Sequence, residues 1–293
     1  MQKIIPHLWF DKEGQEATDL YISLLPNSER AQVATIEGTP SGEVSVLDFT
    51  LSNLKFQGIN AGPYFHFNET ISLFISLDSP EAVDRMYDAL TPGGEVLMPL
   101  ESYDFCPRYA WISDRYGLNW QLMYNSENRA IPTVRPSLLF SGPQCGQAQI
   151  ALRYYSEVFE DSKPGEVSYY LEGEAQTDLA IINYAELQIG GLDLVMMDNA
   201  MGGNNTFTEA LSFIVLCDDQ EEIDYYWAQL SHDPEAEQCG WLKDPFGVSW
   251  QIVPTRLGDL MKGPVEAVNR VTQAFLGMKK FDISALEKAY KGE

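Results

Sequence analysis

The chain has 293 residues, of which 45% are hydrophobic, and its 43 acidic and 19 basic side chains give a formal net charge of −24 at pH 7. This length and composition fit two globular domains, and the negative charge repels nucleic acid and anionic membrane surfaces, so we expect neither as a partner. The N-terminus has no apolar run of signal length and no stretch reaches the roughly 20 residues of a membrane helix, so we expect a cytoplasmic protein. The cysteines form no Cys-x-x-Cys pair, which predicts four reduced, buried thiols at Cys106, Cys145, Cys217 and Cys239.

Apolar periodicity in the first half predicts a strand, a helix and three strands, and then the same order again. Residues 4–10 form an apolar run typical of a strand. Ala17, Leu20 and Leu24 then recur at helical spacing, and Pro26 ends the helix. We expect helices over 14–25 and 80–90, and further strands over 32–36, 44–51, 55–60, 71–77, 95–98, 109–113 and 120–124.

The second half of the chain repeats the first. The motif Asp-x-x-Gly-x-x-Trp-Gln ends both residues 111–121 and residues 241–251, a shift of 130 positions (241 − 111), and the opening strand recurs at 134–140. Between them, residues 67–72 match residues 207–212 at a shift of 140 (207 − 67), so a later connection in the second half is shorter. The chain therefore contains two related domains in tandem.

The repeat sets the expected domain boundaries. We expect a first domain over 1–130, a second over 131–258 and a helical C-terminal tail over 259–293, with a linker at 125–133. Within the tail, 264–278 and 283–290 are expected to be helical. An apolar stripe along the first of these helices is typical of a helix that docks on its own protein.

Three motifs in this order resemble one protein family. Pro6-His7-Leu8-Trp9-Phe10 opens the repeated unit, Asp-x-Phe-Gly-x-x-Trp-Gln closes it at 244–251, and residues 273–283 are similar to the family's ending. The chain resembles the vicinal oxygen chelate (glyoxalase/bleomycin resistance) superfamily and, within it, the PhnB-like branch labelled 3-demethylubiquinone-9 3-methyltransferase. The resemblance covers essentially the whole chain.

The resemblance implies an α+β fold of tandem glyoxalase-like domains, each built from two βαβββ modules forming a curved mixed sheet, plus a helical tail. Single-domain members of this branch generally pair, so the two halves are expected to form an intrachain pseudo-dimer, and a homodimer of the whole chain stays open. The fold hosts isomerases, dioxygenases, antibiotic hydrolases and metal-free binding proteins, so it implies no single activity. The chain lacks the Gly-x-Gly-x-Gly turn of common S-adenosylmethionine enzymes, so we do not predict a methyltransferase.

Alternation along the strands predicts which side chains line a trough in each half. His7, Ser72 and Gln121 lie on the face away from the helix-packing side chains, and we expect them to converge in the first trough. Glu69 at the rim and Asn60 at a strand end are further candidates, and a turn role is open for each. The other candidate ligand-binding residues are Trp9, Phe74 and Met123 in the first trough and Ser137, Ser212 and Gln251 in the second.

The metal site that the resemblance implies is incomplete. Metal-using members of the superfamily hold a divalent ion on a His from the opening strand, a second ligand from the fifth strand and a carboxylate from the closing strand. Only His7 matches, because Ser72 and Gln121 stand at the other two positions, and a hydroxyl and an amide bind a cation more weakly. We therefore predict no metal site, with His7 the only plausible ligand, and a divalent metal is the only cofactor left open.

These residues favour a small-molecule binding protein whose ligand is unknown and which has no strong metal site. The alternative is a divalent-metal-dependent vicinal oxygen chelate enzyme of the lyase/isomerase, dioxygenase or transferase type, in which a cation on His7, Gln121 and Glu69 polarises the substrate. A third hypothesis is a partner-binding module that docks through its acidic surface and C-terminal helices. Whether the chain is an enzyme stays open, and no catalytic residue is assigned.

Overall fold

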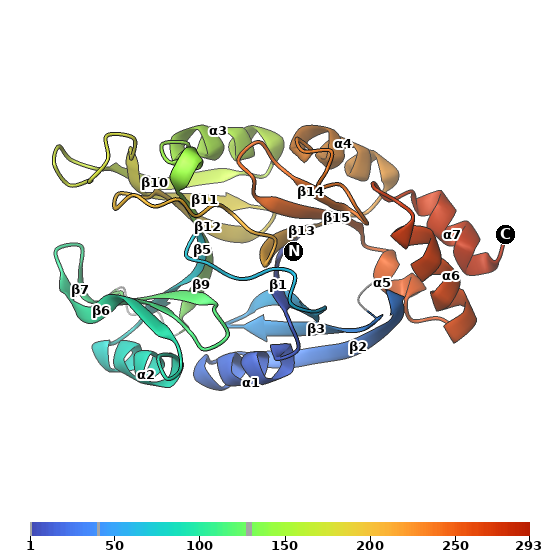
Figure 1. Cartoon of the computed structure of the whole chain (residues 1–293), viewed down its shortest axis with the longest axis horizontal. Helices are drawn as coiled ribbons and strands as arrows, with labels where there is room; N and C mark the ends of the chain where they lie inside the picture. The colour runs from blue at the N-terminus through green and yellow to red at the C-terminus, as the bar shows by residue number, and fades with distance from the viewer. Residues whose placement is uncertain (1, 40–41, 127–130) are drawn as a thin grey trace.

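The computed structural model describes residues 2–39, 42–126 and 131–293, which form two mixed β-sheets (Figure 1). Sheet A runs in the order β14 (Trp241–Lys243), β15 (Ser249–Pro254), β13 (Leu211–Cys217), β1 (Ile4–Phe10), β4 (Leu54–Asn60), β3 (Gly42–Leu51) and β2 (Glu29–Thr39). Sheet B runs in the order β10 (Lys163–Tyr169), β11 (Ile182–Ile189), β12 (Leu192–Asp198), β9 (Thr133–Phe140), β5 (Ile71–Leu77), β8 (Asn119–Tyr124), β7 (Cys106–Ser113) and β6 (Glu95–Tyr103). Residues 127–130 of the predicted linker lie outside the described part of the chain.

Four helices cover the outer faces of the two sheets (Figure 1). The covering helices are α1 (Gly14–Leu24), α2 (Pro80–Leu90), α3 (Ala148–Val158) and α4 (Gln220–Leu230). The described chain also has α5 (Leu257–Leu260), α6 (Val265–Leu276) and α7 (Ile283–Lys291), and a 3₁₀ turn at Gly142–Gln144. Helix α1 packs on β2, β3 and β4, and α4 on β13, β14 and β15, all in sheet A, whereas α2 and α3 pack on sheet B. The face of each sheet turned away from its helices is called the inner face below. Among the described helices, none has the length and apolar character needed to cross a membrane.

Each sheet combines strands from both halves of the chain. Strand β1 pairs with β13 from the second half, and β5 from the first half pairs with β9. Each of these strands opens a module and would otherwise leave its backbone donors and acceptors bare at a sheet edge. The predicted α+β class, the tandem repeat and the intrachain pairing of the halves are therefore confirmed. The expected convergence of His7 with Ser72 and Gln121 is wrong, because β1 lies in sheet A and β5 and β8 lie in sheet B.

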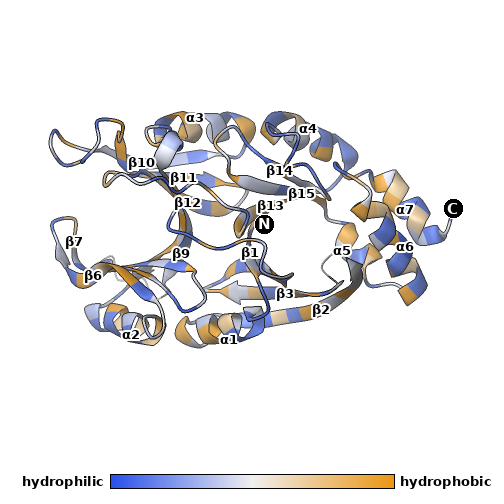
Figure 2. Ribbon diagram, in the orientation of Figure 1, coloured by the Kyte–Doolittle hydropathy of each residue, from blue (hydrophilic) through white to orange (hydrophobic). Residues whose placement is uncertain are grey.

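Local sequence signals set several element ends as predicted, although β2, β6 and β7 are longer than the strands expected over 32–36, 95–98 and 109–113. Ser52 and Asn53 both adopt positive φ, 47° and 68°, in the two-residue turn between β3 and β4, a conformation typical of tight hairpins. Ser79 accepts a hydrogen bond from the backbone N–H of Ala82 and caps α2, with Pro80 in the first turn. Figure 2 shows that the covering helices carry both apolar and polar residues, as amphipathic helices on a sheet do.

The repeated Asp-x-x-Gly-x-x-Trp motif ties each closing strand to a helix. Asp244 accepts hydrogen bonds from the Tyr155 hydroxyl at 2.6 Å and the Trp250 indole N–H at 2.9 Å, and from the backbone N–H groups of Phe246 and Val248. An equivalent cluster joins Asp114 to Tyr21 and Trp120 in the first half. Both tryptophans are fully buried, so the prediction that they are core anchors is confirmed. Burial raises the pKa of Asp244 to about 6, against the opposing hydrogen bonds.

The fourth module is shorter than the other three. It has β13, α4, the three-residue β14 and β15, and residues 231–240 contribute only an isolated bridge between Gln238 and Trp241. The expected fourth repeat of the full βαβββ order is therefore wrong in its second strand, the counterpart of β6. The shorter connection after α4 supplies too few residues for a hairpin like β6 and β7.

The C-terminal tail forms the two predicted helices and docks on the end of sheet A, opposite β6, β7 and β10 (Figure 1). The backbone N–H groups of Cys239 and Gly240 donate to the carbonyls of Met278 and Lys279 at 2.8 and 2.7 Å. Phe281 is buried against Gly240. The prediction that the tail packs on its own chain is confirmed, although Val265 of the expected apolar stripe is exposed.

All four cysteines are free thiols, as predicted. Cys106 and Cys217 are buried, whereas Cys145 and Cys239 are half-buried, so the expectation of burial is met at two of the four positions. Burial raises the pKa of the Cys217 thiol to about 12, which disfavours its reactive thiolate form.

Candidate functional site

A row of polar side chains crosses the inner face of sheet A. His7 lies directly opposite Ser212 on β13 and beside Gln57 on β4, and cross-strand partners point to the same side of a sheet. The row continues through Gln57, whose amide donates to Asp48 on β3 at 2.9 Å. The opposite face of the same strands carries the apolar core residues Leu8 and Phe10, so polar and apolar side chains alternate as the sequence predicts.

His7 and Ser212 form one hydrogen-bonded chain with Gln251 on β15. The Gln251 amide donates to Ser212 Oγ at 3.0 Å, and Ser212 Oγ lies 3.3 Å from His7 Nδ1. Since the Ser212 oxygen already accepts from Gln251, its own hydrogen can be donated to Nδ1, which leaves the histidine hydrogen on Nε2. His7 is only 3% exposed, and burial lowers its pKa to about 3, so the imidazole is neutral at physiological pH.

Aromatic rings surround His7. Trp241 on β14 meets the His7 ring edge-on with centroids 5.6 Å apart, and Trp9 lies 6.2 Å from Trp241. The Trp9 indole donates to the Gly62 carbonyl at 2.8 Å, and its ring also packs against Phe65. Trp9 was predicted to face the ligand, but Trp241 was not, because only the pairing of the two halves places it beside His7.

The inner face of sheet B carries a corresponding chain built from other residues. The Tyr109 hydroxyl donates to the Gln121 amide oxygen at 2.7 Å, and the Gln121 amide nitrogen donates to Ser72 Oγ at 2.8 Å. Ser72 lies directly opposite Ser137, which occupies the position of His7. Tyr109 is buried, and burial raises its pKa, so it stays protonated and acts as a donor. Ser72 and Gln121 of the first predicted trough thus meet, but they lie beside Ser137 from the second half. Ser212 and Gln251 of the second predicted trough meet in the same way, but beside His7 from the first half.

Arg135 is a further polar residue of this face, and it was not among the predicted site residues. Its guanidinium donates to Glu186 at 2.6 Å and to the Tyr184 hydroxyl at 2.9 Å, and it stacks over the Phe74 ring at 5.1 Å. Burial opposes ionisation of Glu186, but hydrogen bonds from Tyr184 and Arg135 outweigh it and lower the pKa of that carboxyl. The signal available in the sequence was the arginine at a position where the first half has Ile5.

The remaining predicted residues lie in three different settings. Met123 shares the inner face of sheet B, opposite Tyr109. Asn60 instead faces the helix side, where it accepts a hydrogen bond from the Gly14 backbone N–H at 2.9 Å and caps α1. Glu69 accepts from the Asn205 amide at 2.6 Å in a loop contact between the halves. The hydrogen bonds of Asn60 and Glu69 thus join them to α1 and to the loop around Asn205, and neither includes His7.

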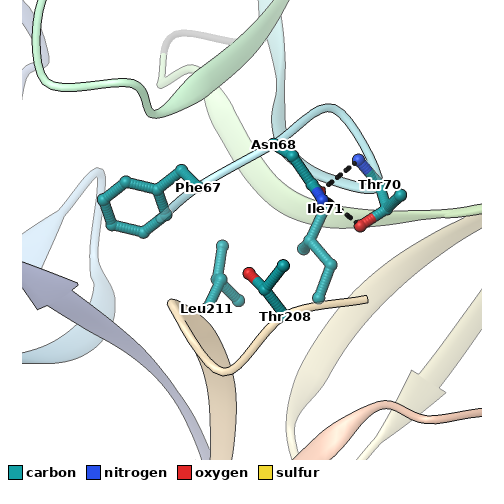
Figure 3. A pocket seen from close by; sticks show the side chains of 6 residues that line it. All are labelled: Phe67, Asn68, Thr70, Ile71, Thr208 and Leu211. Atoms are coloured by element: carbon teal, nitrogen blue, oxygen red, sulfur yellow. Dashed lines mark hydrogen bonds between the residues drawn. The ribbon is translucent and has the colours of Figure 1, made fainter. Parts of the chain in front are cut away.

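A small pocket near Glu69 belongs to this junction between loops (Figure 3). Asn68 Oδ1 accepts from the Thr70 backbone N–H at 3.0 Å, and the Asn68 amide donates to the Thr206 carbonyl at 2.9 Å. The pocket is too narrow for a small-molecule ligand. Its lining residues are Phe67, Asn68, Thr70, Ile71, Thr208 and Leu211.

The donors around His7 do not fit a divalent metal. Its hydrogen-bonding neighbours are the Ser212 hydroxyl and, through it, the Gln251 amide. No group of three or more His, Cys, Asp and Glu side chains suited to a metal ion occurs over residues 2–39, 42–126 and 131–293. Zinc and similar transition-metal ions bind most strongly through imidazole, thiolate or carboxylate, and His7 is the single such group in this described hydrogen-bonded chain.

Comparison with known proteins identifies the family. The family model described as 3-demethylubiquinone-9 3-methyltransferase matches residues 2–123 and again residues 132–253. The chain belongs to this family. A solved structure from Bacillus cereus, a putative 3-demethylubiquinone-9 3-methyltransferase, PhnB protein, is 30% identical over 42% of this chain and 100% of that chain, with a TM-score of 0.40. No curated protein matches the sequence.

More distant structures share the fold of this family member over most of its length. Glyoxalase I from Zea mays is 11% identical over 86% of this chain and 93% of that chain, with a TM-score of 0.55. A putative dioxygenase from Bacillus subtilis is 13% identical over 94% of this chain and 96% of that chain, with a TM-score of 0.50. The tandem glyoxalase-like fold predicted from the sequence motifs is therefore confirmed.

Proposed function

We propose that this member of the 3-demethylubiquinone-9 3-methyltransferase family binds a small molecule without a metal, on the inner face of sheet A. The supporting observation is the hydrogen-bonded chain of His7, Ser212 and Gln251 beside the rings of Trp9 and Trp241. A few oriented polar groups beside aromatic surface are typical of sites for small organic ligands.

The polar groups indicate the chemistry of the ligand. The neutral His7 ring can donate from Nε2, and Gln251 and Ser212 hold its Nδ1 side, so the site presents an oriented donor without net charge. Trp9 and Trp241 offer apolar ring surface. An uncharged, partly aromatic ligand with a carbonyl or ether oxygen suits this combination.

The methyltransferase in the family description has no support in these residues. S-adenosylmethionine enzymes of the common class bind the cofactor at a glycine-rich turn from a strand into a helix. Here Gly190 and Gly191 form the hairpin turn between β11 and β12, and Gly93 and Gly94 lie between α2 and β6. The metal-dependent alternative calls for a carboxylate beside His7, whereas its described hydrogen-bonded chain consists of the Ser212 hydroxyl and the Gln251 amide. We therefore derive no reaction step through either group.

The proposal can be tested by thermal-shift screening of uncharged aromatic carbonyl compounds against four proteins. These are the wild type, His7→Ala, Gln251→Ala and the control His232→Ala, whose histidine is exposed. We expect a compound to stabilise the wild type and His232→Ala, with loss of the shift in both inner-face variants. A compound that stabilises all four equally binds elsewhere and would contradict the proposal. Urea unfolding of each unliganded variant separates lost binding from lost folding.

A further inference from the structure

One buried side-chain oxygen on the inner face of sheet A, Ser249 Oγ, has no hydrogen-bond partner, and the inner face of sheet B has several such groups. Within the described chain, buried side-chain polar atoms without a partner include four on this face. They are Trp111 Nε1, Asn119 Oδ1, Arg135 Nε and Ser137 Oγ.

Three of the four residues lie directly beside Ser72 or Gln121, and the fourth, Arg135, lies one side chain further away. Ser137 and Asn119 are the direct strand neighbours of Ser72 on its two sides, and Trp111 is the direct neighbour of Gln121. Arg135 lies opposite Phe74, one side chain further along the same face. Buried polar groups normally find a partner, so this many unpartnered groups on adjoining positions mark a place that a ligand completes.

The unpartnered groups are mainly donors. Trp111 and Arg135 each offer an N–H, and Ser137 offers a hydroxyl, whereas Asn119 Oδ1 is the single obligate acceptor. The Arg135 side chain is 15% exposed and carries a fixed positive charge. An oxygen-rich, negatively charged group matches a set of this kind.

The guanidinium of Arg135 is already fixed in place. One of its terminal nitrogens donates to Glu186 and Tyr184, and its plane lies over the Phe74 ring. A guanidinium has five N–H donors, so it can hold Glu186 and a second carboxylate at the same time. In sheet A, Ile5 and His7 occupy the positions of Arg135 and Ser137, so the matching position on that face holds no arginine.

We propose that the inner face of sheet B is a second ligand site, selective for a small molecule that carries a carboxylate on a flat apolar body. The carboxylate accepts from Arg135 Nε and Ser137 Oγ, and the apolar body packs against Phe74 and the ring of Trp111. This goes beyond the function proposed for sheet A, because the residues, the sheet and the charge of the ligand all differ.

Calorimetric titration of the full chain with benzoate, and with benzamide as the uncharged analogue, tests the proposal. We expect benzoate to bind about tenfold or more tightly than benzamide, because hydrogen bonds to charged groups exceed those between neutral groups. Arg135→Gln should weaken benzoate binding by about tenfold or more, and Arg108→Gln should leave it unchanged. Arg108 is the matched control because it pairs with Asp84 of α2, on the helix side of the same sheet.

Ser137→Ala separates a ligand-binding role from a structural one. Since Ser137 Oγ has no partner in the protein, its removal should leave the unfolding midpoint unchanged or raise it, while benzoate binding weakens. Absence of benzoate binding, equal binding of benzamide, or binding indifferent to both Arg135→Gln and Ser137→Ala would overturn the proposal. Benzoate binding that is lost in His7→Ala but retained in Arg135→Gln would place the ligand on sheet A, and would overturn this inference without touching the proposed function.

Discussion

Burial of neutral His7 makes the stability of the protein depend on acid pH. The pKa of His7 falls from 6.5 to about 3 in the folded state, so protons bind the unfolded chain first as the pH drops. The contribution of the neutral His7 ring to the free energy of unfolding is therefore complete above about pH 6.5 and is lost as the pH falls towards about 3. The whole shift of about 3.5 units corresponds to at most about 5 kcal/mol, and the 1.5 units between about pH 6.5 and pH 5 to about 2 kcal/mol.

Replacing His7 with Phe removes the titrating group and keeps a flat ring in the site. We expect the free energy of unfolding of the wild type to fall by about 2 kcal/mol more than that of His7→Phe between about pH 7.5 and pH 5. Urea unfolding followed by tryptophan fluorescence at both pH values gives this difference. The control His232→Phe replaces an exposed histidine and should behave like the wild type. An identical pH slope for His7→Phe and the wild type would refute the assignment of a buried, neutral imidazole.

Two further predictions concern the residues that hold the site in place. The pKa of Asp244 is raised from 3.8 to about 6, so its contribution to stability is complete below about pH 4 and is lost as the pH rises through 6. Because the unfolded carboxyl is already partly ionised at pH 4, the wild type should lose about 2 kcal/mol relative to Asp244→Asn between about pH 4 and pH 7. Parallel unfolding curves for the two proteins would contradict this. Phe281→Ala should cost about 3 kcal/mol and release α6 and α7 to rapid hydrogen exchange, whereas Val265→Ala, at a position 70% exposed, should do neither. Unchanged exchange of the tail in Phe281→Ala would show that Phe281 does not hold the tail on sheet A.

The sequence was sufficient to predict most elements and the repeat, because both depend on local patterns. The alternation in 4–10, the hairpin signal at Ser52 and Asn53, and Pro80 at a helix start each specify one element without reference to the rest of the chain. The inward direction of His7 and Gln121 also followed from alternation alone.

The partners of these side chains could not be predicted in the same way. His7 meets Ser212 across 205 positions of chain, and this contact depends on which modules join at their edge strands. Arg135 meets Glu186 across 51 positions within one module, and this contact depends on the strand order β9, β12 and β11. A module can pair through its edge strand with the other module of its own half or with a module of the other half. The apolar periodicity of the strands is the same in both arrangements, so it does not predict which one forms. Loss of the second strand in the fourth module had a partial signal, the shorter connection after α4, but its length alone does not say which element is absent.

The central claim is that the site around His7 works without a metal. Calorimetric titration of Mn²⁺, Ni²⁺ and Zn²⁺ into metal-free wild type and His7→Ala tests it most directly. The hydroxyl and amide beside His7 lead us to expect no stoichiometric binding that depends on this residue. Binding of one ion per chain in the wild type, abolished by His7→Ala and retained in His232→Ala, would contradict the account and restore the metal-dependent alternative.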